Sequence, residues 1–172
     1  MRSLPAIKLL ADFFLILHNQ FIMGIEQDIN QTNFRNEFQK AAINFIYTYN
    51  WMNEKMKHIF DKEDITSQQF NILRILRGAG KPISTLQIRQ RMLDKMSDTS
   101  RIVDRLLVKE LVKKDTCPND KRLVDVSITD KGKLLLQKID GYNNEMDAIF
   151  DNLSEADARS LNNLLDKLRA DK

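Results

Sequence analysis

The 172-residue sequence contains one cysteine, two histidines, five glycines and three prolines. The single cysteine, Cys117, cannot form an internal disulfide, and with two histidines it cannot supply the four ligands of a structural zinc site. The scarcity of glycine and proline argues against a fold made of many tight turns. With 42% apolar and 30% charged residues, the composition is that of a helix-rich domain that needs neither metal nor cofactor. A lone cysteine is also compatible with the reducing cytoplasm, so we expect a cytoplasmic protein.

The sequence also lacks an apolar run long enough to cross a membrane. Residues 9–25 are rich in apolar side chains, but Asp12 and His18 interrupt them before the roughly 18 residues that a span requires have accumulated. No small-residue cleavage site of a signal peptide follows. Because Met23 offers an alternative start, we expect residues 1–22 to be a dispensable extension.

Catalytic patterns are missing as well. The two histidines, His18 and His58, lie in separate segments, so no arrangement of serine or cysteine with histidine is recognisable. We therefore expect no catalytic residues, and the protein is not predicted to be an enzyme.

What the chain does have is an uneven distribution of charge. Residues 71–133 hold 15 Lys and Arg against 8 Asp and Glu, a net charge of +7, whereas the remainder has a net charge of −4. Positive charge concentrated in one segment is typical of proteins that bind an anionic partner such as nucleic acid.

Helical periodicity dominates the first half. Apolar residues recur over residues 34–60 at the spacing of one long amphipathic helix. Thr66 with Gln69 three positions later predicts a capping box that opens a second helix. The glycines at 78 and 80 predict its end, because glycine accepts the left-handed backbone of a helix C-terminus.

Two shorter helices are expected next. Ser84 with Gln87 predicts a capping box and a helix to about residue 92, with Leu86 and Ile88 as core candidates. Ser97 or Asp98 can cap the following helix, which should run to about residue 110. Its apolar side should consist of Ile102, Val103, Leu106 and Leu107, and the opposite side of Ser97, Arg101, Asp104, Arg105 and Val108.

A basic β-hairpin should follow these helices. Residues 111–114 and 123–129 have the character of strands, and residues 117–120 have turn chemistry. Lys121 and Arg122 lie just beyond the expected tip. Helical patterning then resumes from Asp130 to about residue 150, and Ser154 can cap a final helix with leucines at 161, 164, 165 and 168.

Two short helices, a tight turn and a basic hairpin predict a winged helix-turn-helix, in a mainly α fold with a small β-hairpin wing. An α-helix fits the DNA major groove, and the wing can reach phosphates or the minor groove. The predicted DNA-binding residues are Ser97, Thr99, Ser100, Arg101 and Arg105 on the helix, and Lys121 and Arg122 on the wing.

At residues 100–106 (SRIVDRL), 111–112 (LV), 120–122 (DKR) and 128–132 (ITDKG) the sequence resembles the MarR (multiple antibiotic resistance regulator) family. The resemblance covers roughly residues 30–170. It implies a homodimer, with interlocked N- and C-terminal dimerisation helices, that binds a pseudo-palindromic operator in double-stranded DNA. It also implies a response to a small-molecule effector or an oxidant.

The resemblance also assigns roles and exposes two departures. Asp104 lies where a carboxylate can hold the wing arginine, and Asp120 belongs to the wing motif, so both are expected to position the wing. Glu110 replaces the glycine that usually precedes the Leu-Val pair, and Lys114 stands where arginine is common. The glutamate leaves the geometry of that turn open.

The expected division of the chain is an extension over 1–22, a dimerisation helix over 23–66, a DNA-binding module over 67–130 and C-terminal dimerisation helices over 131–172. Two interpretations of the function remain: a regulator of transcription, most simply a repressor, and a helical protein-interaction module that kept a winged fold without reading DNA. Retention of Arg101, Arg105, Lys121 and Arg122 favours DNA. The identity of the effector, the sequence of the operator and any redox role of Cys117 stay open.

Overall fold

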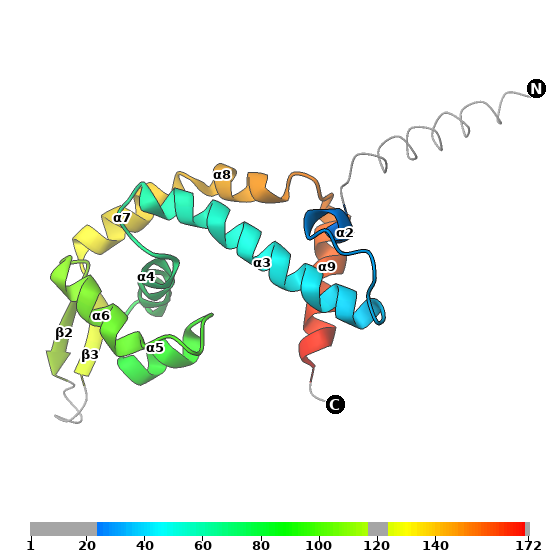
Figure 1. Cartoon of the computed structure of the whole chain (residues 1–172). Helices are drawn as coiled ribbons and strands as arrows, with labels where there is room; N and C mark the ends of the chain where they lie inside the picture. The colour runs from blue at the N-terminus through cyan, green and yellow to red at the C-terminus, as the bar shows by residue number, and fades with distance from the viewer. Residues whose placement is uncertain (1–23, 117–123, 171–172) are drawn as a thin grey trace, which may run out of the picture. The chain divides into compact units, whose positions relative to one another are not determined.

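A computed structural model describes residues 24–116 and 124–170 (Figure 1). The predicted extension over 1–22 and the predicted wing tip lie outside these ranges. The chain divides into two compact units, one ending at Asn50 and the other beginning at Trp51. The predicted division of the chain into four segments stays a prediction.

The first unit contains α2 (Ile25–Asp28) and the beginning of α3 (Glu37–Asp61), so the single long helix expected over 34–60 is present. Ile25 is buried, and Glu26 forms an ion pair with Lys40 of α3. The apolar side chains of this part of α3 are largely exposed, among them Phe38, Phe45, Ile46, Tyr47 and Tyr49.

The second unit has a small sheet among helices. Besides the end of α3, its elements are α4 (Ser67–Ala79), β1 (Ile83–Ser84), α5 (Thr85–Arg91), α6 (Thr99–Val108), β2 (Val112–Thr116), β3 (Val124–Ile128), α7 (Asp130–Asp140), α8 (Asn143–Asp147), η1 (Ala148–Phe150) and α9 (Glu155–Arg169). The strands pair antiparallel in the order β1-β3-β2. The predicted fold class, mainly helical with a small β wing, is confirmed.

Helix starts follow the predicted capping residues. The amide of Gln69 donates to Thr66 Oγ1 at 3.2 Å, and the amide of Thr66 donates to Gln69 Oε1 at 3.1 Å, which completes the capping box of α4. The same reciprocal pair forms between Ser84 and Gln87 at α5. Gly80 ends α4 with a left-handed φ of 63°, as the sequence predicted.

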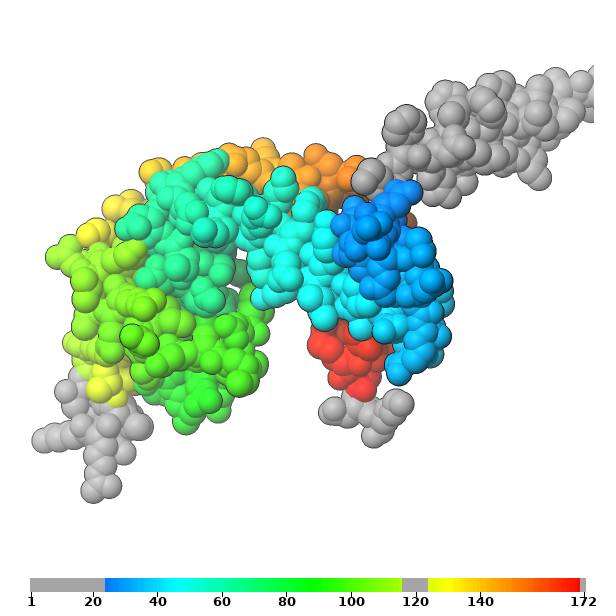
Figure 2. Space-filling view, in the orientation of Figure 1, coloured from blue at the N-terminus to red at the C-terminus, as the bar shows by residue number. Residues whose placement is uncertain are grey.

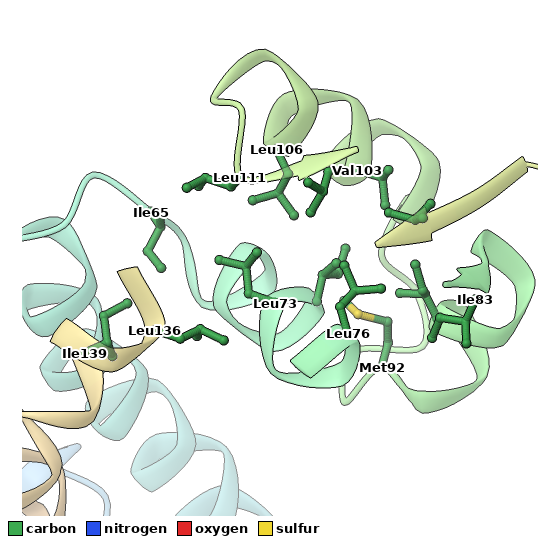
Figure 3. Close-up of a cluster of buried hydrophobic side chains, with 14 of the residues drawn as sticks. Ile65, Leu73, Leu76, Ile83, Met92, Val103, Leu106, Leu111, Leu136 and Ile139 are labelled. Atoms are coloured by element: carbon green, nitrogen blue, oxygen red, sulfur yellow. The ribbon is translucent and has the colours of Figure 1, made fainter. Parts of the chain in front are cut away.

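One hydrophobic core holds the second unit together (Figure 3). Side chains of α6, among them Val103 and Leu106, extend toward Leu73 and Leu76 of α4. Ile88 is fully buried as predicted, but the prediction for Leu86 was wrong because that side chain is 63% exposed. Residues two apart on a helix point to different sides, so this short helix cannot bury both.

Two further features escaped the sequence analysis. The pair Ile83 and Ser84 forms a third strand, which is too short to show alternation. The helix expected from 130 to about 150 ends at Asp140, and α8 and η1 follow after Gly141. Across the described parts of the chain, no helix combines the length and the apolar character that a membrane span needs.

Candidate nucleic-acid interface

The start of α6 is fixed by its cap. Asp98 Oδ1 accepts a hydrogen bond from the amide of Arg101 at 3.1 Å, so Asp98 is the N-cap. Its negative charge also interacts favourably with the positive N-terminal end of the helix dipole, which stabilises the start of α6. Ser97 was the other residue predicted to cap this helix. Its hydroxyl instead donates a hydrogen bond to the carbonyl oxygen of Asp94 at 2.8 Å.

The turn between α5 and α6 is held by α4. The amide of Leu93 donates to the side-chain oxygen of Asn71 at 3.0 Å, across 22 positions of sequence. Within the turn, the amide of Met96 donates to Asp94 Oδ1 at 3.0 Å. Sequence reasoning missed Asn71 because a contact this distant in the chain leaves no periodic or spacing signal.

Helix α6 has one buried side and one exposed side. Val103 and Leu106 have no exposed surface, which anchors the helix to the core. Figure 2 shows atoms of α5 and α6 in green on the surface of the second unit. The exposed side of α6 carries Ser100, Arg101, Asp104, Arg105 and Val108. Within the described residues, neither arginine forms an ion pair.

Two of the predicted contact residues are less accessible than expected. Ser97 is half-buried. Thr99 is only 4% exposed, and its hydroxyl is buried without a hydrogen-bond partner in the described parts of the chain. Its place as the first residue of α6, directly under the cap, turns the side chain inward. We therefore remove Thr99 from the set of candidate contacts.

The exposed side of α6 is linked to the wing by an ion pair. The ammonium group of Lys114 in β2 donates a hydrogen bond to the carboxylate of Asp104 in α6. The resemblance implied that Asp104 holds Arg122, which lies outside the described residues, as do Lys121 and Asp120. The structure thus places Lys114, the departure from the common arginine, at the carboxylate expected to position the wing.

The turn after α6 explains the glycine that this sequence lacks. Glu110 has a left-handed φ of 60°, a conformation that glycine adopts without strain. Its carboxylate lies 2.9 Å from Lys131 Nζ, and this hydrogen bond lowers the pKa of Glu110. The hydroxyl of Thr129 donates to the Glu110 carbonyl at 2.8 Å. The sequence left the geometry of this turn open. The structure shows that Glu110 adopts the left-handed backbone conformation that glycine would adopt without strain.

The motif after β3 fastens α7 to the same turn. Thr129 caps α7 by accepting a hydrogen bond from the amide of Gly132 at 3.1 Å. A Cβ atom on Gly132 would lie 2.3 Å from the carbonyl oxygen of Leu111. Only glycine permits this approach, so the motif holds the base of the hairpin against the end of α6.

No metal-binding cluster accompanies this surface in the described residues. Over residues 24–116 and 124–170, no group of three or more His, Cys, Asp or Glu residues is positioned to hold a metal ion.

Comparison with known proteins identifies relatives of this arrangement. Residues 65–124 match the family model described as the MarR family. The HTH-type transcriptional repressor MdtR of Bacillus subtilis is 28% identical over 85 residues, which are 49% of this chain and 54% of MdtR. The chain therefore spans about half the length of this curated relative.

Solved structures match over a longer stretch. A cysteine-to-serine mutant of MarR from E. coli, complexed with operator DNA, gives a TM-score of 0.72 at 22% identity, covering 81% of this chain and all of the other. BpsR of Bordetella bronchiseptica, whose DNA binding is regulated by 6-hydroxynicotinic acid, gives 0.66 at 20% identity, covering 76% and 99%. At these identities the likeness establishes the fold alone.

Proposed function

We propose that this chain, whose residues 65–124 match the MarR family model, is a transcription regulator of that family that binds double-stranded DNA through α6 and the wing. We further propose that it acts as a homodimeric repressor on a pseudo-palindromic operator. Release by a small molecule completes the proposal.

The observation that carries the proposal is the exposed side of α6. Arg101 and Arg105 are exposed, and neither forms an ion pair with another of the described residues. Ser100 lies beside them near the start of the helix. Arginine can donate two hydrogen bonds to a guanine edge, and residues near the start of a recognition helix are those that reach base edges. We assign base contacts to Ser100 and Arg101, and a phosphate or base contact to Arg105.

The wing supplies the second part of the proposed interface. Lys114 holds β2 against Asp104 of α6, so the direction of the hairpin is tied to the reading helix. Lys121 and Arg122 are proposed to contact phosphates or the minor groove, where positive charge is favoured. Their roles rest on the sequence and the family.

The proposed dimer rests on exposed apolar side chains at both ends of the chain. In α9, Leu161, Leu164 and Leu168 are 41%, 64% and 76% exposed. Several aromatic residues of α3, among them Phe45 and Tyr49, are about half exposed. Apolar surface of this extent marks an interface, and an interlocked dimer should bury more than about 2,000 Å². Sedimentation at micromolar concentration tests it.

A genomic binding experiment tests the DNA function. Fragments of the source genome retained by the purified protein are sequenced to define an operator, and affinities are measured across a salt series. Arg101→Ala should cost about 1 to 3 kcal/mol on the operator and relax the preference at one position. Arg169→Ala, the same change at the far end of α9, is the matched control and should bind as wild type does.

The alternative function, a winged protein-interaction module, predicts another outcome. Such a module would retain no specific fragments, and Arg101→Ala would have no effect on its weak, salt-sensitive DNA binding. No observation on the described residues favours this alternative over DNA binding. An operator bound equally well by wild type, Arg101→Ala and Arg105→Ala would show that α6 is not the reading helix.

Release by a ligand has its own test. BpsR shows that a relative of this fold is regulated by a small aromatic acid, and this supports an effector of similar size here. Screening small acids for loss of operator binding tests release.

A further inference from the structure

The second unit contains a bay on its surface that the proposed DNA interface does not use. The bay has a volume of about 540 Å³ and lies among the end of α4, the segment before β1, the strands β2 and β3, and α7. Pockets that hold small ligands typically have volumes of about 300 to 1,000 Å³. The bay is therefore large enough for a small organic molecule.

The lining of the bay has an excess of positive charge. Four cationic side chains, Arg77, Lys81, Lys113 and Lys133, line it together with one carboxylate, Asp140. Their formal sum is +3, and the cations come from α4, the segment before β1, β2 and α7. Positive charge gathered from four parts of the fold favours an anion of more than one charge.

The ion pairs around the bay show which cations are available. Arg77 donates two hydrogen bonds to the Asp140 carboxylate, at 2.6 and 3.2 Å. Its guanidinium group is therefore already paired with a carboxylate in the lining of the bay. Lys133 pairs with Asp130 at 2.9 Å, and that carboxylate is 93% exposed. Lys113 lies 3.8 Å from Asp115, beyond hydrogen-bond distance. Lys81 has no ion pair within the described residues. Lys81 and Lys113 are therefore the readiest partners for an anion.

The rest of the lining is apolar, with one hydroxyl. Leu76, Pro82 and Ile128 contribute to it, so an occupant would contact carbon as well as charge. Ser127 lies directly opposite Lys113 in the pairing of β2 with β3. Its hydroxyl is buried and has no hydrogen-bond partner among the described residues, which leaves an unsatisfied polar atom beside the bay.

We propose that this bay binds a phosphorylated small molecule with a compact apolar body. The phosphate would lie among Lys81, Lys113 and Lys133, because ammonium groups act as point charges that suit a tetrahedral dianion approached from several directions. The body would pack on Leu76 and Pro82. A monocarboxylate would leave much of the positive charge uncompensated.

The position of the bay suggests a consequence for the proposed regulator. Lys113 and Ser127 belong to the two strands of the hairpin, so a phosphate bound among Lys81, Lys113 and Lys133 would tie the base of the wing to the segment before β1 and to α7. This consequence rests on the proposed function, whereas the binding site itself does not. A ligand that binds one orientation of the wing more tightly than the others shifts DNA affinity by at most the difference between its binding free energies for those orientations.

Calorimetry with phenyl phosphate tests the site on the full chain without DNA. Phenol and inorganic phosphate, titrated separately, supply the body and the charge alone. Phenyl phosphate should bind about tenfold or more tightly than either, and Lys81→Gln and Lys113→Gln should each weaken it about 3- to 10-fold. Lys57→Gln, an exposed lysine of α3, is the matched control and should bind as wild type does. Thermal unfolding confirms that each variant folds.

Three results would overturn the site. Phenyl phosphate that binds no better than inorganic phosphate indicates an adventitious ion only. Binding of phenyl phosphate by Lys81→Gln and Lys113→Gln as tight as by wild type places the ligand elsewhere. Absence of binding, together with reduced salt dependence of DNA affinity in both variants, assigns the lysines to the DNA backbone. Failure of the chain to bind any DNA would reject the proposed function and leave the phenyl phosphate titration unchanged.

Discussion

Helices α4 and α9 start with the same kind of cap but differ in how much of their surface is buried. Both open with a capping box, and in each the hydroxyl of the cap accepts an amide hydrogen bond at 3.2 Å, from Gln69 to Thr66 and from Asp157 to Ser154. Both are amphipathic. Yet α4 buries Gln69, Ile72, Leu73 and Leu76, whereas α9 buries no residue.

This difference separates two kinds of information in a sequence. Caps and apolar periodicity decide where a helix forms, and they act within a few residues. Which helix is buried depends on partners distant in the chain. Helix α4 packs against α6, α7 and the sheet, and the leucine stripe of α9 stays exposed within this chain. Substitutions in the two helices therefore test how far stability follows these long-range contacts rather than the local signals.

The largest contrast is expected between two leucines. Leu73→Ala removes a side chain with no exposed surface and should lower the free energy of unfolding by about 2 to 5 kcal/mol, because it leaves a cavity. Leu164→Ala on α9, where the side chain is 64% exposed, should change it by less than about 0.5 kcal/mol in the monomer. Denaturant titration measures both.

Protein concentration extends this test to the proposed dimer. If α9 is part of the interface, the effect of Leu164→Ala should depend on concentration over a range of about a hundredfold, and the effect of Leu73→Ala should be large throughout. A loss for Leu164→Ala that equals the loss for Leu73→Ala at every concentration would contradict the contrast between the helices.

The fold was predictable wherever its signals are local. The capping residues Thr66, Ser84 and Ser154 all start the helices predicted from them. The two-residue strand β1 was missed because its pairing with Val126 is set by tertiary structure. Leu86 was placed in the core because a seven-residue helix contains too few apolar positions to define its buried side.

Two glycines give the next contrast. Gly132→Ala places a Cβ atom 2.3 Å from the Leu111 carbonyl oxygen, and backbone cannot move aside cheaply, so a loss of about 1 to 3 kcal/mol is expected. Gly78→Ala in α4 meets no atom within 4 Å and should be neutral or stabilise by about 0.5 to 1 kcal/mol through helix propensity. Thermal unfolding decides, and equal shifts for both variants would remove the claimed close approach.

A carboxylate at the entry to α4 should make stability depend on pH. Glu63 accepts hydrogen bonds from the Tyr142 hydroxyl at 2.7 Å and from Lys138 Nζ at 2.9 Å, which lower its pKa below the ordinary value of 4.5. Its contribution is therefore fully present above that value and is lost as pH falls through the lowered pKa.

Glu63→Gln should cost about 1 kcal/mol at neutral pH and flatten the decline of stability below pH 4.5. Glu155→Gln, at an exposed ion pair of α9, is the matched control and should leave the profile nearly unchanged. Unfolding curves from neutral to acidic pH measure both. Parallel profiles for wild type and Glu63→Gln would show that this carboxylate is not coupled to folding.

The candidate site was predictable in part. The exposed positions of Arg101 and Arg105 follow from helical periodicity, and the structure places them as expected. The burial of Thr99 was not predictable, because a residue at the very start of a helix has no full turn before it to define a face. Asn71 and Lys114 act through contacts with distant segments, which periodicity does not record.

The smallest expected effect concerns the turn at Glu110, where local backbone chemistry and a side-chain contact oppose each other. Glycine would relieve the left-handed φ of 60° but would lose the contact with Lys131 and gain freedom in the unfolded chain. Glu110→Ala keeps the strain and loses the contact, so it should have the lowest Tm. The Tm of Glu110→Gly should lie about 2 to 4 °C above that of Glu110→Ala and close to that of wild type.

Salt separates the two contributions. At about 1 M salt the ion pair is screened, so the Tm of wild type should approach that of Glu110→Ala while the difference between the alanine and glycine variants persists. If Glu110→Ala and Glu110→Gly unfold at the same temperature at both salt concentrations, the left-handed backbone costs this turn nothing. The glutamate would then be as suitable there as the glycine it replaces.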